Sequence, residues 1–230
     1  GSAQAPIHLH VAPRYINDSM QEIGVANIVT SVLASYRAFD TFGEVVVIFT
    51  AGIGVLALLS VAFRRTDTDR DVVKIDSLNN SMHEEHLVLR IVSKMLIPFI
   101  LLFALYVQFH GDYGPGGGFQ AGVIFAAAII LYAMLFGMST ARRVINQSLT
   151  QMLAAIGVLL YGSVGLVSLL NGKNFLDYSA LSADPIAGQH LGILLIELGV
   201  GITVASIMII IFFNFVGRRN NPLRKENKDF

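Results

Sequence analysis

Residues 110–138 read HGDYGPGGGFQAGVIFAAAIILYAMLFGM, and the change of character within this stretch decides the fold. Its first part, residues 111–118, holds five glycines and Pro115, and we call it the glycine loop. Glycine readily adopts positive φ and proline lacks an amide hydrogen, so this part predicts an irregular connection. Its second part, residues 119–138, is a continuous apolar run, long enough to cross the roughly 30 Å core of a bilayer. The stretch therefore predicts a loop that leads into a transmembrane helix.

The whole chain has the composition of a membrane protein, because 54% of its residues are hydrophobic and only 14% are charged. We predict an all-α, polytopic integral membrane protein with about five transmembrane helices and a short N-terminal interfacial helix. Residues 24–34 are too short to span and predict the interfacial or re-entrant helix, while the polar residues 1–22 predict an extended external segment. The five predicted spans are 42–63, 91–109, 119–138, 149–170 and 191–216.

Basic residues are distributed unevenly over the predicted connections, which predicts the orientation. Twelve lie after the first span, after the third span or in the C-terminal tail, and three lie on the other side, with Lys94 set aside as within a span. Basic loops stay in the cytoplasm, so the glycine loop and the N-terminal segment are predicted outside and the C-terminus inside. The twelve are Arg64, Arg65, Arg70, Lys74, Arg90, Arg142, Arg143, Arg218, Arg219, Arg224, Lys225 and Lys228, against Arg14, Arg37 and Lys173.

Several functions are disfavoured by composition. The net charge of zero argues against a nucleic-acid partner, and the absence of cysteine excludes disulfides, iron–sulfur ligation and thiolate zinc sites. The glycine loop lacks the Gly-Lys-Ser/Thr ending of a phosphate loop, and residues 83–86 (HEEH) lack the zinc-binding His-Glu-x-x-His spacing. We therefore expect no cofactor, no metal site and no stand-alone enzyme.

Three ionisable residues within or beside the predicted spans are candidate functional residues. Glu197 lies inside the last span, where a carboxylate costs roughly 2.5–3.5 kcal/mol on insertion scales; it either handles protons or cations, or makes a structural hydrogen bond. Glu44 follows Asp40 at the start of the first span, where spacing alone favours an ordinary acidic helix start. Lys94, four residues before Pro98, either snorkels to the surface or faces a hydrated path.

The charged residues 64–87 divide the chain into three predicted parts. Residues 1–63 form a front module, residues 64–87 a cytoplasmic linker, and residues 88–230 a four-helix module with a cytoplasmic tail. The spacing Gly118-xxx-Gly122 predicts a smooth helix face for close packing within the chain or with other subunits.

Two motifs of the back module resemble those of the B subunit of Mrp-type multisubunit cation/proton antiporters. The first motif, residues 111–122 (GDYGPGGGFQAG), is similar to the family's Gly-x-x-x-Pro-Gly-Gly-Gly-Phe-Gln-x-Gly pattern. The second motif, residues 196–204 (IELGVGITV), resembles the family's acidic-x-Gly-Val-x-Leu-Thr-Val pattern. Glu197 takes the acidic position, and Ile202 stands where the family often has Leu. The residues that match the first pattern are Gly111, Pro115, Gly116, Gly117, Gly118, Phe119, Gln120 and Gly122.

The front module carries a second resemblance. Residues 27–44 (NIVTSVLASYRAFDTFGE) resemble a segment of the E subunit of membrane-bound hydrogenases and of the end of the Mrp A subunit, with Ser35 in place of an acidic residue. In those families the glutamate at the Glu44 position is regarded as an ion-translocation residue. The resemblance therefore implies an ion-translocation role for Glu44 and implies one less strongly for Glu197. We keep Lys94 and Asp40 as weaker candidates for ion translocation.

Together the resemblances imply a subunit that contributes to assembly and to an ion route, and does not act alone. Its complex would exchange cytoplasmic Na⁺ for external H⁺ in a bacterial or archaeal cell membrane. The implied partners are antiporter subunits of the A, C, D, E, F and G types and membrane lipid, and the glycine loop is expected to serve assembly. Two alternatives stay open: a related hydrogenase or respiratory complex, and a purely structural scaffold subunit.

Overall fold

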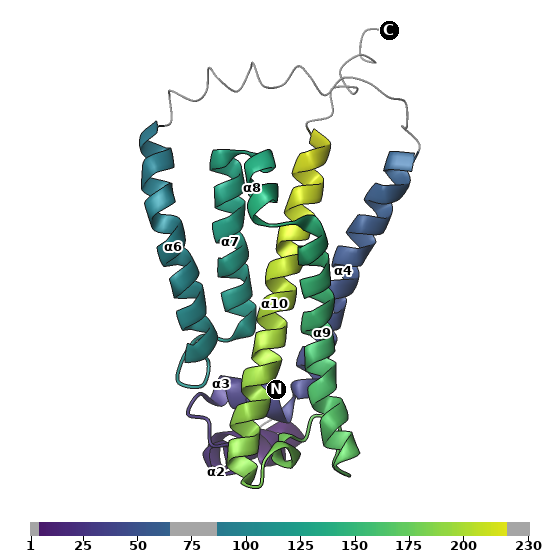
Figure 1. Cartoon of the computed structure of the whole chain (residues 1–230). Coiled ribbons are helices and arrows are strands. Elements are labelled where there is room, and N and C mark those ends of the chain that lie inside the picture. The colour runs from purple at the N-terminus through teal and green to yellow at the C-terminus, as the bar shows by residue number, and fades with distance from the viewer. Residues whose placement is uncertain (1–4, 65–86, 220–230) are drawn as a thin grey trace.

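The computed structural model describes residues 5–64 and 87–219, and within these ranges the regular structure is entirely helical. Five long helices stand side by side in one bundle (Figure 1). All five have an apolar stretch of sufficient length to cross a membrane, which confirms the predicted polytopic all-α fold. They are α4 (Ala38–Arg64), α6 (Leu87–His110), α7 (Gly118–Phe136), α9 (Gln147–Leu170) and α10 (Pro185–Arg219).

Helix α10 is the centre of the bundle and packs against α9, α7 and α4. In the most apolar 18-residue stretch of α10, 67% of the residues are buried inside the protein. The corresponding share is 17% for α4 and 17% for α6. Small residues allow the close packing, since an added Cβ at Gly199 would lie 2.7 Å from the carbonyl oxygen of Gly157. Gly122 packs in the same way against the carbonyl oxygen of Gly201, 2.7 Å from its ideal Cβ.

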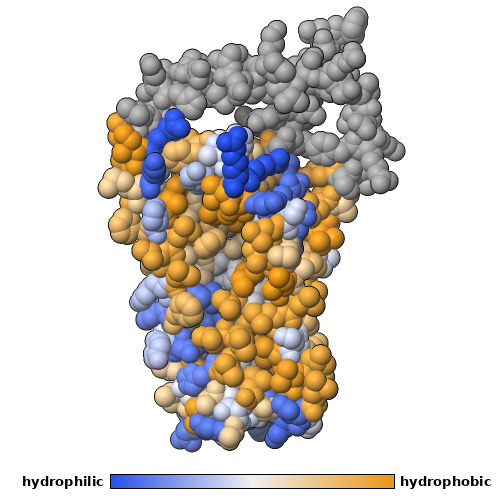
Figure 2. Space-filling view, in the orientation of Figure 1, coloured by the Kyte–Doolittle hydropathy of each residue, from blue (hydrophilic) through white to orange (hydrophobic). Residues whose placement is uncertain are grey.

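The outer sides of α4 and α6 remain apolar and exposed. On α6 these side chains include Met95, Phe99 and Phe103, and on α4 they include Val47 and Leu58. On the face that Figure 2 shows, hydrophobic residues cover most of the bundle, and hydrophilic residues lie near its upper end and along the lower left. Such a surface suits contact with lipid chains or with apolar helices of other proteins.

The N-terminal segment is helical, so the prediction of an extended segment over residues 1–22 was wrong for the part that is described. It forms η1 (Ile7–Val11), α1 (Ala12–Asn17) and α2 (Ser19–Glu22), which lie across the lower end of the bundle (Figure 1). Pro13 stands in the first turn of α1, a position where a missing amide hydrogen is harmless. The predicted interfacial helix is present as α3 (Ile28–Thr30) followed by η2 (Ser31–Tyr36).

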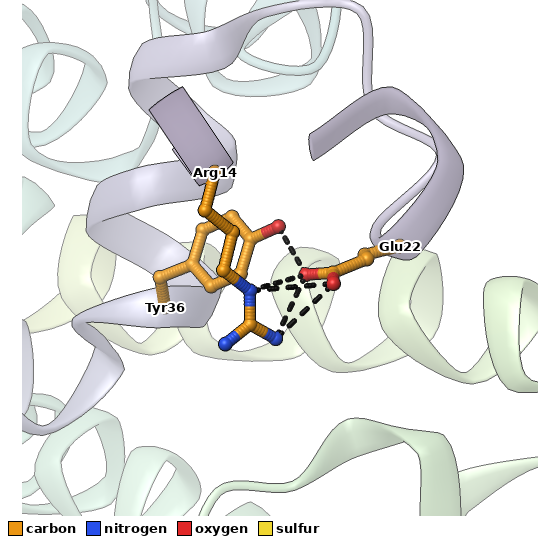
Figure 3. A network of polar contacts seen from close by, with 3 residues as sticks. All are labelled: Arg14, Glu22 and Tyr36. Carbon is orange, nitrogen blue, oxygen red and sulfur yellow. Dashed lines mark hydrogen bonds and ion pairs between the residues drawn. The ribbon is translucent and has the colours of Figure 1, made fainter. Parts of the chain in front are cut away.

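A polar network fastens this segment to η2, and Figure 3 shows its three residues. Arg14 lies 3.1 Å from a carboxylate oxygen of Glu22, and the Tyr36 hydroxyl donates to the same carboxylate. The hydrogen bond from Tyr36 has the larger effect and that from Arg14 the smaller, and together they hold the pKa of Glu22 below its usual value. Burial, helped by the bond to Glu22, raises the pKa of the Tyr36 phenol. The segment is therefore held by tertiary contacts that its own sequence pattern does not display.

Several helix boundaries differ from the predicted spans by a few residues, among them the starts of α4 and α6, and two of the differences have a clear local cause. Helix α7 ends at Phe136 because Gly137 adopts φ +87°, after which α8 (Met138–Val144) runs separately. Helix α10 begins at Pro185, six residues before the predicted span, because the Asp184 carboxylate accepts from the amides of Ile186 and Ala187. The 3₁₀ turn η3 (Tyr178–Leu181) precedes this start.

Most of the predicted linker and tail lies outside the residues that the structure describes. Residues 65–86, which include the HEEH sequence at 83–86, and residues 220–230 lie outside the described ranges. Because many of the basic residues lie there, the orientation of the termini stays a prediction, and so do the three domain boundaries.

Candidate functional site

The glycine loop folds back over the end of α6. The amide of Gly117 donates to the carbonyl oxygen of Val107 at 3.0 Å, and the amide of Gly114 donates to that of His110. Gly117 adopts φ +109°, a region that residues with a Cβ avoid, and Gly118 is already the first residue of α7. The loop is therefore a compact turn with defined hydrogen bonds, as its glycine and proline content predicts.

The carboxylate of Glu197 is enclosed by this bare backbone. An ideal Cβ would lie 2.9 Å from Oε2 of Glu197 if built on Gly111, and 2.9 Å from Oε1 if built on Gly117. At Gly118 a Cβ would collide with the carbonyl oxygen of Glu197 itself. Sequence reasoning treated the loop and Glu197 as separate features, whereas the structure makes the loop the wall against which Glu197 rests.

Glu197 makes no hydrogen bond or ion pair among the residues that the structure describes. It is only partly accessible, on a helix whose neighbours are mostly apolar. A structural carboxylate in such surroundings normally accepts hydrogen bonds from a neighbouring helix. Within the described ranges no fully buried side-chain oxygen lacks a partner, so the Glu197 oxygens are reachable from the space beside the helix.

A cavity of about 710 Å³ brings Glu197 together with Glu44. Its wall combines α3, η2, α4, α6, α7, α10 and the glycine loop, so it lies between the front and back modules. Its polar lining residues are Asn27, Thr30, Thr41, Glu44, Gln120 and Glu197, and the loop contributes Pro115, Gly116, Gly117 and Gly118, followed by Phe119.

The contact with Gly118 also fixes the depth of Glu197. Helix α7 has 19 residues and is therefore about 28 Å long, close to the thickness of the hydrocarbon layer. It begins beside Glu197, because Gly118 touches the carbonyl oxygen of that residue and the amide of Gly201. Glu197 thus lies beside the first residue of α7, at the end of that helix that carries the glycine loop.

Two front-module residues hold the glycine loop in place, and sequence reasoning missed both. The Asn27 side chain donates to the carbonyl oxygens of Gly111 at 2.9 Å and Gly114 at 2.7 Å. The Thr30 hydroxyl donates to the same oxygen of Gly111 at 2.6 Å. The available signal was Asn27 directly before an apolar run, which is typical of a helix N-cap. Asn27 is that cap, since its side chain accepts from the amide of Val29.

Four other candidates do not line the large cavity, and one of them is Gly111, which instead contacts Glu197 from the loop. Asp40 pairs with Arg37 at 2.6 Å, and both side chains are more than half exposed. Lys94 is exposed on α6, near the opposite end of the bundle from the loop. Gly122 borders a smaller, largely apolar cavity of about 240 Å³. No group of three metal-binding side chains occurs within the described ranges.

Two family models match the chain. The model for a domain related to the MnhB subunit of Na⁺/H⁺ antiporter covers residues 88–210. The model for MbhE, the E subunit of MBH, covers residues 3–76. Among individual proteins, "Putative antiporter subunit mnhB2" of Staphylococcus aureus is 34% identical over 145 residues, which is 60% of this chain and the whole of that protein.

Two solved structures resemble the chain over most of its length. The first belongs to the Mrp complex from Dietzia sp. DQ12-45-1b, with a TM-score of 0.72 and 28% identity. That match covers 93% of this chain but only 23% of the much longer Dietzia chain. The second belongs to the membrane-bound sulfane sulfur reductase, an archaeal respiratory membrane complex, with a TM-score of 0.53, 28% identity and coverage of 88% and 85%.

Proposed function

Because the chain belongs to the family of domains related to the MnhB subunit of Na⁺/H⁺ antiporters, we propose that its cavity forms part of an ion route. The chain is a subunit of a multisubunit cation/proton antiporter and a multi-pass membrane protein, and other antiporter subunits are its partners. We propose that these include subunits of the A, C, D, E, F and G types, with membrane lipid against the exposed sides of α4 and α6.

One observation carries this proposal: Glu44 and Glu197 line the same cavity, and neither carboxylate has a hydrogen-bond partner among the described residues. A carboxylate that no protein group satisfies is free to bind either a proton or a monovalent cation, but not both fully at once. Competition for one site is the simplest physical basis for exchange. The cavity gives both ions a common place to enter.

Orientation completes the proposal. With the glycine loop outside, the cavity lies at the outer end of the bundle, in the cell membrane of a bacterium or archaeon, and the C-terminus is cytoplasmic. Protons would then reach the carboxylates from outside, while Na⁺ arrives from the cytoplasm through partner subunits. Lys94 and Asp40, which lie away from the cavity, take a lesser part in this route.

The test uses inverted membrane vesicles that carry the whole complex. A pH-sensitive dye reports how fast added Na⁺ dissipates a preformed proton gradient. We expect Glu44→Gln and Glu197→Gln each to slow this exchange at least tenfold while the complex still purifies intact. Asp18→Asn is the matched control, because Asp18 is an exposed acidic residue outside the cavity. Unaltered exchange in both glutamate variants would reject the proposal.

The likeness to an archaeal respiratory membrane complex supports a second candidate function. In that case the chain serves the same ion route inside a complex whose other subunits hold redox centres. Nickel or iron–sulfur clusters in the purified complex would favour this candidate. A third candidate, a scaffold without an ion route, predicts silent glutamate variants and a complex that falls apart when Gly117 is replaced by a bulky residue.

A further inference from the structure

A second pair of ionisable side chains lies beside the glycine loop. Nδ1 of His190, in the second turn of α10, is 3.3 Å from Oδ2 of Asp112 in the loop. The side chain of His190 is 42% exposed and that of Asp112 is 24% exposed. Neither residue lines the large cavity.

The pair is connected to Glu197 in two ways. Glu197 follows His190 by seven residues on α10, which places the two on one helix face about 10 Å apart along the axis. Asp112 directly follows Gly111, whose ideal Cβ would lie 2.9 Å from Oε2 of Glu197. Asp112 therefore lies between the more exposed His190 and the part of the loop that touches Glu197.

We propose that His190 and Asp112 form the external proton-exchange point that serves Glu197. The inference rests on the proposed function, because it requires Glu197 to exchange protons during transport. In the forward direction the imidazole of His190 accepts a proton from external water, and Asp112 stabilises the resulting imidazolium. The proton then passes by way of Asp112 to Glu197, which releases its bound cation, and His190 returns to its neutral form.

Chemistry favours histidine for this position. Imidazole is the side chain whose ordinary pKa lies in the range where external pH varies, so it both accepts and releases protons there. A neighbouring carboxylate fixes the ring orientation through one nitrogen and leaves the other for exchange. In this structure Nδ1 faces Asp112, and Nε2 lies toward Gly24, 3.4 Å from the ideal Cβ of that glycine.

Tyr113, next to Asp112 in the loop, is exposed, and several other titratable groups of the surrounding elements have partners elsewhere. Among the described residues, Asp112 is the charged side chain that an ion pair joins to His190. The remaining groups and their partners are Glu22 with Arg14, Tyr178 with the carbonyl oxygen of Ala34, Tyr161 with that of Ala38, Asp177 with Ser179, and Asp184 with the first amides of α10. A change in charge at His190 is therefore transmitted mainly to Asp112.

The test measures exchange by the whole complex in proteoliposomes over a range of external pH. We expect His190→Gln to remove the inflection that wild type shows between about pH 6 and 8 and to slow exchange about tenfold at the alkaline end. His190→Ala should behave alike and recover when millimolar imidazole is added outside, because a diffusing base replaces the missing one. A structural role predicts no such rescue. His110→Gln is the control, since His110 stacks on Tyr106 and forms no ion pair with an acidic residue in the described part of the chain.

The outcomes separate this inference from the proposed function. If Glu197→Gln abolishes exchange while His190→Gln keeps the wild-type pH profile, the proton-exchange role of His190 is overturned and the ion route stands. Loss of activity in His190→Ala without imidazole rescue also overturns it. If Glu197→Gln leaves exchange intact, the proposed function itself fails.

Discussion

Gly118 and Glu197 meet backbone to backbone, so that α7 starts where α10 presents its acidic residue. A methyl group on Gly118 would overlap the carbonyl oxygen of Glu197, and neither helix offers a flexible side chain that could move aside. This contact fixes the spacing of the two helices, the depth of the carboxylate and the position of the loop.

Replacement of this glycine should therefore destabilise the bundle. We expect Gly118→Ala to lower the free energy of unfolding by about 1–3 kcal/mol, the usual range for an overpacked interior. Thermal unfolding of the purified complex measures the change. Gly54→Ala is the matched control on α4, because nothing lies within 4 Å of the added Cβ. Equal melting temperatures for the two variants would contradict the packing role.

The two hydrogen bonds from the Asn27 side chain act as a clamp on the glycine loop. When this clamp is removed, the amides of the loop should lose protection from hydrogen exchange. Asn27→Ala deletes two hydrogen bonds to the glycine loop, at about 1 kcal/mol each, together with one helix cap. We expect faster hydrogen exchange at the amides of Gly114 and Gly117. Asn146→Ala removes only the cap of α9, in which Asn146 accepts from Ser148 at 3.0 Å, so the difference between the variants isolates the clamp. Similar exchange in both would argue that the loop holds itself.

Acid should loosen the N-terminal segment. Because the pKa of Glu22 is lowered in the folded protein, its bonds to Tyr36 and Arg14 contribute stability above pH 4.5, the ordinary pKa. This contribution disappears as the pH falls below 4.5 and through the folded pKa. An acid-active protease should therefore cut the segment faster as the pH falls through this window. Glu22→Gln should be cut readily at every pH, whereas Asp18→Asn should follow wild type.

Removal of a buried tyrosine hydroxyl should lower the free energy of unfolding more than removal of an exposed one. The Tyr161 hydroxyl donates to the carbonyl oxygen of Ala38 at 2.8 Å and joins α9 to the start of α4. Tyr161→Phe leaves that oxygen without its donor, which we expect to cost about 1–3 kcal/mol of unfolding free energy. Tyr106→Phe provides the comparison, because Tyr106 is 57% exposed on α6. Chemical denaturation of both variants in detergent would reveal the difference, and equal midpoints would count against the bond.

The transmembrane part of the fold was predictable because hydropathy is a local property of the chain. Runs of about 20 apolar residues located five helices, and glycine with proline located the loop. The early start of α10 at Pro185 was not predictable from hydropathy, since the helix extends beyond the apolar layer with residues such as Gln189 and His190. The short N-terminal helices were missed because Tyr36 and Glu22, distant in sequence, hold them.

The candidate site was predictable in its parts and not in its assembly. Glu197 was identified by its charge within an apolar run, and Glu44 by resemblance to a known segment. That both face one cavity follows from the packing of α4 on α10, and no local pattern encodes that packing. The role of Asn27 in holding the glycine loop was not predictable for the same reason, because its partner Gly111 lies 84 residues away in the sequence.

The bonds from Asn27 and Thr30 to Gly111 also bear on how the protein is put together. They join the front and back modules at the end of the bundle opposite to the last residues of α4 and the first residues of α6, between which the chain connects the two modules. A nick in that connection would leave each of these hydrogen bonds in place. Two separately synthesised polypeptides, divided there, should therefore recognise each other and reassemble, so one gene and two genes can encode the same architecture.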